Sequence, residues 1–415
     1  MRWLPLLCLF AVLAPSEAKA GPAEDVATRA CSALSSRVAA VSGGDPVFLR
    51  SYDAGSGEGP NPEPALNAAF TSDNALSVIA LRACGDLDAA RRVGDALLAA
   101  SEEDRTGEAG RLRNAYRPGA VHETPVPPMG WWSEGEQRWD EDPYQVGSAT
   151  GNLAWAALAL LTLADATQDS EYTEGAARIA AWAAKEAMDD RAPAGFAGGL
   201  YGYDDQAQPV GWKSTEHNVD LAAVFDWLAP LQPDADWPEK ALRARDFVAA
   251  LWDPEQRRFW VGTLPDGVTI NRANSGLDAE LWPLLLKDAP AEWQSALAYV
   301  EHNHAARPGF DFNDDRDGVW WEGTAQAALV YRALGQGEKA DRLLKAMARR
   351  FSPGGLLWAT DAARITTGLA LSPSSTTDDF YYFRLPHLGA TAWAALAARG
   401  WNPFTGAPVG AQPVP

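Results

Sequence analysis

Short polar clusters that run directly into Ala- and Leu-rich stretches recur along the chain. There are six of them, at residues 71–74, 148–152, 214–220, 275–280, 320–326 and 387–393. Several contain Ser, Thr, Asp or Asn, which can cap a helix, and the apolar residues that follow recur at helical spacing. The pattern predicts six helices beginning at these clusters. The stretch after Asn152 is apolar almost all round, as expected of a helix covered by protein on every side.

Amphipathic, charge-bearing stretches lie between these clusters and predict a second set of helices. They span residues 24–41, 88–101, 171–189, 238–251, 291–305 and 338–351. Strict alternation of the two kinds predicts helical hairpins closed into a ring, an all-α (α/α)6 toroid over residues 21–400. An open helical solenoid is the alternative, although uneven spacing and long connections count against it. Residues 401–415 are rich in Pro and Gly, and we expect them to form a loose tail.

The first twenty residues are typical of a secretory signal. Arg2 precedes an apolar run at residues 4–14, and Ala18-Lys19-Ala20 provides a small-x-small cleavage site. We therefore expect cleavage after Ala20, a periplasmic or secreted mature protein and no membrane span. In an oxidising compartment Cys31 and Cys84 are free to pair, although two separate buried thiols are an equal alternative.

The excess of acidic residues restricts the classes of molecule that the protein is expected to bind. With 55 acidic against 35 basic residues, the net charge is −20, and no basic stripe is present to follow a phosphate backbone. Nucleic acid is therefore excluded as an expected partner, and anionic polymers should be repelled from most of the surface. A neutral or weakly charged ligand fits better, and we expect a monomer without a cofactor.

Aromatic residues are frequent in the segments before the predicted inner helices. The chain has 18 Trp, and these segments contain Trp131, Trp132, Trp139, Trp212, Trp260, Trp320, Trp321 and Trp358, with Tyr381 and Tyr382 beside them. Indole rings stack on the apolar faces of sugars, while their N–H groups remain available for hydroxyls. Each Trp taken singly is more typical of gap filling, but the set favours a carbohydrate cleft.

Acidic residues gather where the inner helices begin, and free helix amides converge there too. Glycosidic hydrolysis needs one carboxylic acid and one carboxylate. The candidates for catalysis are Glu216, Asp220, Asp278 and Glu322. Glu216 has an equally plausible role as an ordinary first-turn glutamate. Because neighbouring helices pack about 8–10 Å apart, Glu216 and Asp278 are expected at the wide separation that admits a water, which favours inversion.

Other polar and aromatic groups near the same helix starts are expected to bind the substrate. They are Asp73, Asn74, Trp132, Asn152, Trp212, His217, Asn218, Trp321, Tyr382 and His387.

Glu322 also has a competing interpretation. Oxygen-bearing residues alternate from Asp311 to Asp317, and Glu322 is the twelfth residue from Asp311, as in a calcium loop. However, Arg316 stands where such a loop needs Gly. A solvated acidic loop is therefore the default, and no metal site is predicted.

Three strings together resemble the six-hairpin glycosidase superfamily. They are Ser-Thr-Glu-His-Asn-x-Asp at 214–220, Leu-Asp-x-x-Leu-Trp-Pro-Leu-Leu at 277–285 and Trp-x-Glu-Gly-Thr-Ala-Gln-Ala-Ala-Leu at 320–329. The resemblance covers nearly all of the mature chain and is specific for architecture rather than substrate. It implies catalysis at the open end of the inner helices, as in the inverting families 8 and 15. Carried over, it implies Glu216 as the acid and Asp278 as the base, supported by Asp220 and Glu322.

These observations predict an exported glycoside hydrolase with two-carboxylate chemistry. Three alternatives stay open. A sugar 2-epimerase would use His217 and His387, and a polysaccharide lyase would use His217, Asn218 and Tyr382 to remove a proton next to a uronate. A non-catalytic glycan-binding protein of exopolysaccharide assembly would keep the toroid and the aromatic cleft alone.

Overall fold

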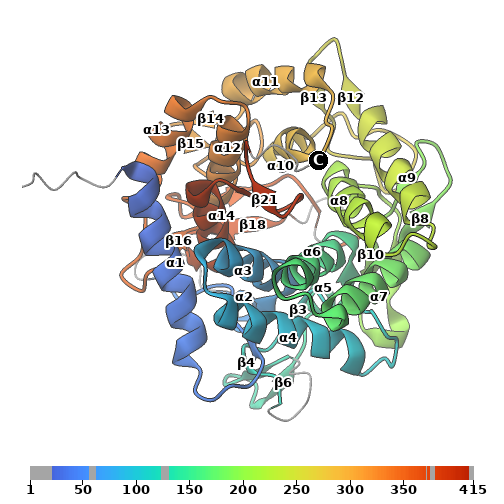
Figure 1. Cartoon of the computed structure of the whole chain (residues 1–415), viewed down its shortest axis with the longest axis vertical. Helices are drawn as coiled ribbons and strands as arrows, with labels where there is room; N and C mark the ends of the chain where they lie inside the picture. The colour runs from blue at the N-terminus through green and yellow to red at the C-terminus, as the bar shows by residue number, and fades with distance from the viewer. Residues whose placement is uncertain (1–20, 56–61, 123–129, 371, 374–378, 411–415) are drawn as a thin grey trace, which may run out of the picture.

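Two concentric rings of helices form the molecule (Figure 1). The computed structural model describes residues 21–55, 62–122, 130–370, 372–373 and 379–410, so the predicted signal at residues 1–20 lies outside the described residues. The inner helices are α3 (Thr71–Cys84), α6 (Thr150–Thr167), α8 (Thr215–Leu231), α10 (Leu277–Leu281) with η2 (Trp282–Leu285), α12 (Trp321–Ala333) and α14 (Leu388–Arg399). The outer helices are α1 (Pro22–Ala40), α4 (Leu87–Glu103), α7 (Ser170–Ala187), α9 (Trp237–Ala250), η3 (Ala291–Ser295) with α11 (Ala296–Asn303), and α13 (Gly337–Met347).

The ring is closed. Consecutive inner helices pack against one another from α3 round to α14, and α14 packs in turn against α3. On the outside, α1 contacts α13, the last outer helix. The predicted (α/α)6 toroid is therefore confirmed, and the open solenoid is excluded.

Burial explains why the two sets of helices differ in composition. In α6, every residue from Thr150 to Ala164 is buried, because α3, α7 and α8 surround it. In α13, by contrast, only Ala340, Leu343, Leu344 and Met347 are buried, which is one face of the helix. The fourth inner helix, α10, is short because Pro283 follows Trp282, and the chain continues there as the 3₁₀ helix η2.

Short antiparallel strands shape the loops. The pairs are β1 (Val47–Phe48) with β4 (Gly119–Ala120), β2 (Ala69–Phe70) with β3 (Ala115–Tyr116), β5 (Trp131–Ser133) with β6 (Arg138–Asp140), β8 (Met188–Asp189) with β9 (Gly195–Phe196), β12 (Trp252–Asp253) with β13 (Arg258–Phe259), β14 (Ala305–Ala306) with β15 (Gly309–Phe310), β16 (Leu357–Trp358) with β19 (Pro386–His387), β17 (Arg364–Thr366) with β18 (Tyr381–Phe383), and β20 (Trp401–Asn402) with β21 (Ala407–Pro408). One sheet has three strands, β7 (Ser148–Ala149), β10 (Gly199–Tyr201) and β11 (Gln208–Val210). The short helices α2 (Glu63–Leu66), α5 (Pro143–Val146) and η1 (Asp204–Gln206) complete the loops.

The C-terminal segment corrects one prediction. Residues 401–410 form the β20–β21 hairpin instead of a loose tail, and residues 411–415 lie outside the described residues. The side chain of Phe404 is buried in the hairpin turn against Trp155 and Trp282. Asn402 Nδ2 also donates a hydrogen bond of 2.7 Å to the Leu285 carbonyl. An apolar anchor therefore orders a segment whose Pro and Gly content suggested disorder. Within the described residues, no helix is long and apolar enough to cross a membrane.

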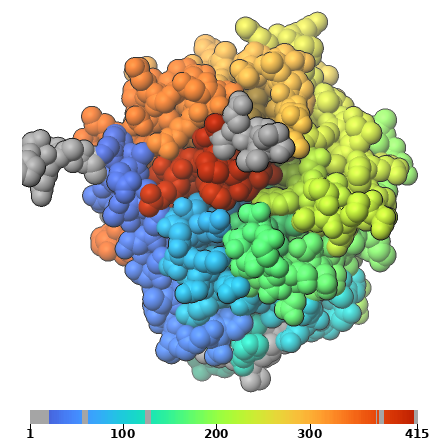
Figure 2. Space-filling view, viewed as in Figure 1, coloured from blue at the N-terminus to red at the C-terminus, as the bar shows by residue number. Residues whose placement is uncertain are grey.

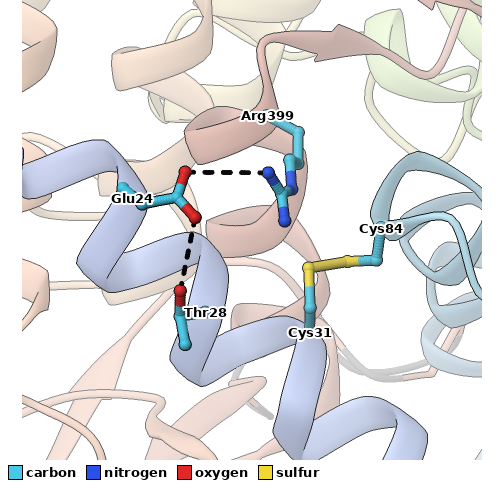
Figure 3. The surroundings of a disulfide bond; sticks show 5 residues. All are labelled: Glu24, Thr28, Cys31, Cys84 and Arg399. Atoms are coloured by element: carbon cyan, nitrogen blue, oxygen red, sulfur yellow. Dashed lines mark hydrogen bonds and ion pairs between the residues drawn. A yellow bond between two sulfur atoms is a disulfide. The ribbon is translucent and has the colours of Figure 1, made fainter. Parts of the chain in front are cut away.

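A disulfide between Cys31 and Cys84 joins the first outer helix to the first inner helix, so the pairing that was left open is confirmed (Figure 3). Beside it, Glu24 of α1 lies 3.8 Å from Arg399 at the end of α14. The helix α1 is thereby tied both to α3 and to α14, where the two ends of the ring meet.

The disulfide closes a loop with a sequence separation of 53 residues. Replacing both cysteines by Ser is expected to lower the free energy of unfolding by about 2–4 kcal/mol, because the unfolded chain regains the entropy of the open loop. Urea unfolding of the variant and of the reduced wild type would measure this loss, and the two should agree. An unchanged midpoint in both would contradict it.

Candidate active site

The first turns of all the inner helices meet at one cavity. It has a volume of about 460 Å³. Its lining residues at or just before these first turns include Asp73, Gly151, Asn152, Glu216, His217, Asp278, Glu322 and His387. Because every inner helix begins at the same end of the ring, side chains separated by over 300 residues share one space.

Caps and loop contacts orient these first turns. Ser214 Oγ accepts a hydrogen bond from the His217 amide at 3.4 Å and so caps the N-terminus of α8. His387 caps α14 in a similar way, since its Nδ1 accepts from the Ala390 amide at 3.4 Å. The imidazole of His387 is thus a structural cap as well as a cavity wall.

Glu216 and Asp278 form a hydrogen-bonded pair of carboxyls. Burial, followed by the charges of Asp278 and Asp220, holds the pKa of Glu216 well above its usual range. Burial raises the pKa of Asp278 only to about 6, because the Ala279 amide and Glu216 donate hydrogen bonds to it. The proton of the pair therefore resides on Glu216, and Asp278 is the carboxylate at neutral pH.

This contact corrects the predicted spacing. Glu216 and Asp278 touch, whereas a water between them would require carboxyls about 6.5–9.5 Å apart. The expectation was wrong because helix spacing fixes the distance between the backbones, whereas side chains from adjacent helices can reach across it to share a hydrogen bond.

Glu322 belongs to a second group, with His387 and Asp73. His387 Nε2 lies 3.2 Å from Asp73 Oδ2, and His387 Nδ1 lies 3.4 Å from Glu322 Oε2. Burial raises the pKa of Glu322 to about 8, although His387 opposes the rise. Burial lowers the pKa of His387, but the Asp73 charge and hydrogen bond outweigh it and the net shift is upward. Glu322 is therefore a carboxylic acid at neutral pH.

Aromatic rings surround this second group. The phenol ring of Tyr52 stacks on His387 with centroids 4.3 Å apart, and Tyr382 lies near both His387 and Trp320. Gly389 leaves the room that this packing needs, since a Cβ there would lie 2.3 Å from Asp73 Oδ1. The histidine is therefore stacked on one ring face by Tyr52 and contacted at both ring nitrogens.

An aromatic cleft is present, but some of the aromatic residues that line it differ from those predicted. Trp212 and Trp320 line the cavity as expected, whereas Trp155, Trp282 and Trp393 line it from deeper turns of the inner helices. The expected Trp132 does not line it and lies half-exposed in the β5–β6 hairpin beside Trp139. Trp321 is fully buried elsewhere, with its Nε1 donating to Asp361 Oδ1 at 3.1 Å.

Two expected binding amides have structural roles instead. Asn74 is bonded to the amide and the carbonyl of Leu49, and Asn218 is bonded in the same way to Phe196. Neither lines the cavity. Each amide fastens the loop that precedes its helix, so both predictions of substrate contact were wrong. Asn152 does line the cavity, with its Nδ2 donating to Asn114 Oδ1 at 2.7 Å.

Asp220 lies one helical turn below Glu216, under the cavity surface. Its side chain is fully buried, and neither carboxyl oxygen has a hydrogen-bond partner among the described residues. Burial, then the charge of Asp278, holds its pKa well above the usual range. His217 is neutral for the same reason, since burial lowers its pKa to about 4.

The acidic loop after Asp311 is separate from this site. Carboxylates of Asp311, Asp315 and Asp317 lie close enough to share a cation, but both oxygens of Asp311 accept backbone amides and Asp317 accepts from Thr366. Glu322 is not part of that group, because it lines the cavity. Its interpretation as the twelfth ligand of a calcium loop was therefore wrong.

Sequence reasoning missed several cavity residues. Tyr52 and Tyr144 come from loops without a periodic pattern, and Lys213 is buried with its Nζ bonded to the Arg191 carbonyl at 2.7 Å. The signal for Lys213 was its position directly before the Ser214 cap.

No known protein-family model matches this chain, and no curated protein sequence matches it either. Solved structures do share its fold. A glycosidase variant in complex with glucose aligns at 12% identity with a TM-score of 0.59, over 91% of this chain and 96% of that one. A family 76 α-mannanase of Bacteroides thetaiotaomicron aligns at 13% identity and 0.57, over 91% and 98%. A sugar epimerase from a ruminal bacterium aligns at 11% identity and 0.60, over 91% and 99%.

The chain therefore has the helical toroid of the six-hairpin glycosidases, the architecture that its sequence resembles. At these identities the likeness defines the fold alone.

Proposed function

We propose that the protein is an exported glycoside hydrolase acting on a neutral or weakly charged oligo- or polysaccharide. The observation that carries the proposal is that three of the candidate catalytic carboxyl groups line one aromatic cavity. Glu216 and Asp278 form a hydrogen-bonded pair, and Glu322 lies apart from them beside His387. Hydrolysis needs one group that is ionised and one that is protonated at the same pH, and this cavity supplies both, because burial raises the pKa of Asp278 to about 6 and that of Glu322 to about 8. The solved glycosidases of the same fold support this choice.

In the proposed reaction, Asp278 is the base and Glu322 is the acid. Asp278 takes a proton from water, the water oxygen bonds to the anomeric carbon, and Glu322 gives its proton to the departing glycosidic oxygen. Glu216 remains protonated and stabilises Asp278 by donating its hydrogen bond. Glu216 then has a supporting role instead of the acid role that the resemblance implies. Because water attacks the anomeric carbon directly in this reaction, without a covalent glycosyl-enzyme intermediate, the configuration is inverted.

The pH dependence of kcat/KM follows from these roles. Asp278 must be ionised and Glu322 protonated, so activity should rise through a pKa of about 6 and fall through one of about 8. Initial rates between pH 4.5 and 9.5 at constant ionic strength would measure the curve. A profile without the upper limb would remove Glu322 from the acid role.

Hydrolysis itself is tested by release of reducing ends from glucans, mannans, amino-sugar polymers and bacterial exopolysaccharides by the purified mature protein. Turnover that disappears in Asp278→Asn would support the proposal. Sugar affinity without turnover on any substrate would instead favour a glycan-binding protein.

A sugar epimerase is the second candidate, favoured by one observation. His217 and His387 both line the cavity, and a solved epimerase shares the fold. Two bases are what proton removal and return at a sugar carbon require. Incubation of free glucose and mannose in D2O tests it, because epimerisation would place deuterium at C2, whereas hydrolysis would not.

A further inference from the structure

A second layer of side chains lies one helical turn below the carboxyls. Trp282 follows Asp278 by four residues on α10–η2, and Gln326 follows Glu322 by four on α12, so each shares a helix face with the residue above it. Trp155 and Trp393 join this layer from α6 and α14, and their rings pack edge-on at 5.7 Å. All four line the cavity, which therefore extends below the reacting groups.

The cavity is closed beneath this layer. Phe404 packs against Trp155 at 5.4 Å and Trp282 at 5.6 Å between ring centroids. It belongs to the C-terminal hairpin, which lies over the centre of the ring on the face seen in Figure 2. A polymer therefore has no passage along the ring axis and can enter this space only with one of its ends.

Polar atoms of the second layer lack partners. Gln326 is fully buried, and neither its Oε1 nor its Nε2 has a hydrogen-bond partner among the described residues. The same holds for Nε1 of Trp282 and of Trp393. Buried amide and indole groups without partners destabilise a protein by about 1–3 kcal/mol each, so their presence around one space points to a ligand rich in hydroxyls.

The charge of the cavity restricts that ligand. Lys213 is the one Lys or Arg among its described lining residues, and the Lys213 Nζ is bonded to Asp189 and to the Arg191 carbonyl. Asp278 contributes negative charge directly above the second layer. A uronate in this space would bury a carboxylate without a cation, which is strongly unfavourable.

We propose that the second layer binds the terminal sugar of the substrate, that this sugar is neutral, and that the protein consequently removes single sugars from chain ends. Gln326 and the two indole N–H groups bond its hydroxyls, and Trp155 and Trp393 cover its apolar face. Removal of end residues rests on the proposed hydrolase function, whereas binding of a neutral monosaccharide does not.

Monosaccharide binding by the full mature protein is the first test, measured by ligand-observed NMR and calorimetry. The probes are glucose, mannose, galactose, N-acetylglucosamine and glucuronate. At least one neutral sugar should bind, and glucuronate should bind at least about 10-fold more weakly than that sugar. Equal binding of glucuronate, or no binding of any neutral sugar, would overturn the proposal.

Gln326→Leu is the decisive variant. It should weaken binding of that neutral sugar by about 10- to 100-fold, because hydroxyls lose one donor and one acceptor. It should also raise Tm by about 1–3 °C, since Leu removes an amide without partners. A residue that merely supports the fold would lower Tm instead. Unchanged sugar affinity in this variant would overturn the assignment.

Thr162→Val is the matched control. It also removes a polar function from a buried inner-helix side chain, but Thr162 does not line the cavity and bonds the Leu158 carbonyl at 2.8 Å. Sugar affinity should stay unchanged, and Tm should fall.

Product analysis on the best substrate completes the test. Monosaccharide should be the only early product, and oligosaccharides of intermediate length appearing first would overturn action at chain ends. If the sugar binds as described and no substrate is cleaved, the hydrolase proposal fails while the terminal-sugar site stands.

Discussion

Asp278→Asn is expected to reduce kcat/KM by about 100- to 10,000-fold on any substrate that the wild type cleaves. The amide keeps the size of the carboxylate and still accepts a hydrogen bond from Glu216, but it cannot take a proton from water. General-base catalysis contributes about 100- to 10,000-fold, and the loss should fall in that range. Initial rates at pH 7 measure it, where Asp278 of the wild type is ionised.

The variant Glu322→Gln tests whether Glu322 is the general acid and Asp278 the general base. On a poor leaving group this variant should lose about as much activity as Asp278→Asn, because the departing oxygen receives no proton. On an aryl glycoside of the same sugar, whose phenolate leaves unaided, it should retain most of its activity, whereas Asp278→Asn should stay inactive. If both variants responded equally to the leaving group, the roles would be wrong.

Two Glu216 variants distinguish support from acid catalysis. Gln still donates to Asp278, so Glu216→Gln should lose only about 10-fold, whereas Glu216→Ala removes the donor and should move the lower limb of the pH profile upward. If Glu216 were the acid, Glu216→Gln would instead show the dependence on leaving group. Asp165→Asn, at the exposed end of α6, is the matched control and should behave as wild type.

Much of the architecture could be predicted from the sequence, because a helix buried on all sides and a helix buried on one face have different patterns of residues. The inner helix α6 shows the first pattern and the outer helix α13 shows the second. The hairpin around Phe404 could not be predicted from the sequence, because one anchoring aromatic residue does not produce a periodic pattern.

For the site, the sequence could predict only that it lies at the first turns of the inner helices. Successive residues of a helix point about 100° apart, so Asp73 faces the cavity while Asn74 fastens Leu49. Trp320 and Trp321 differ in the same way. Composition marks the first turn, but which of its residues faces the cavity depends on how each helix is rotated by its neighbours. The contact between Glu216 and Asp278 depends further on side-chain torsions, which no sequence pattern encodes.

The folded protein is expected to be most stable near pH 5 and to lose stability steadily up to pH 8. Burial raises the pKa of several carboxyls: Asp278 to about 6, Asp311 to about 7, Glu280 and Glu322 to about 8, and Glu216 and Asp220 further. Below pH 4 these groups are protonated in both states. As pH rises above about 4.5, the unfolded chain ionises while the native state keeps its protons, so unfolding becomes more favourable. Each pKa unit of such a difference corresponds to about 1.4 kcal/mol.

Two histidines and one aspartate determine how folding stability falls on the acid side of its pH optimum. Burial lowers the pKa of His217 and His304 to about 4, so protonation of the unfolded chain below pH 6.5 favours unfolding there. The carboxyl of Asp189, whose pKa is about 2, contributes stability that is lost only as pH falls below about 3.8. The two histidines oppose the six carboxyls only between pH 5 and about 6.5, and the reduced net negative charge at low pH acts with the carboxyls. Stability should therefore rise on moderate acidification and collapse only in strong acid.

Urea unfolding at pH 5, 6, 7 and 8 and constant ionic strength measures the slope, and Asp220→Asn identifies one of its sources. Asp220 has no hydrogen-bond partner among the described residues, so its amide variant should keep the fold and show a smaller loss of stability between pH 5 and 8. Asp165→Asn should leave the slope unchanged, because that side chain is exposed. A stability that is flat or rises from pH 5 to 8 would mean that these carboxyls reach water in the folded protein. Asp278 and Glu322 would then titrate together near pH 4 and would no longer supply a base and an acid at the same pH.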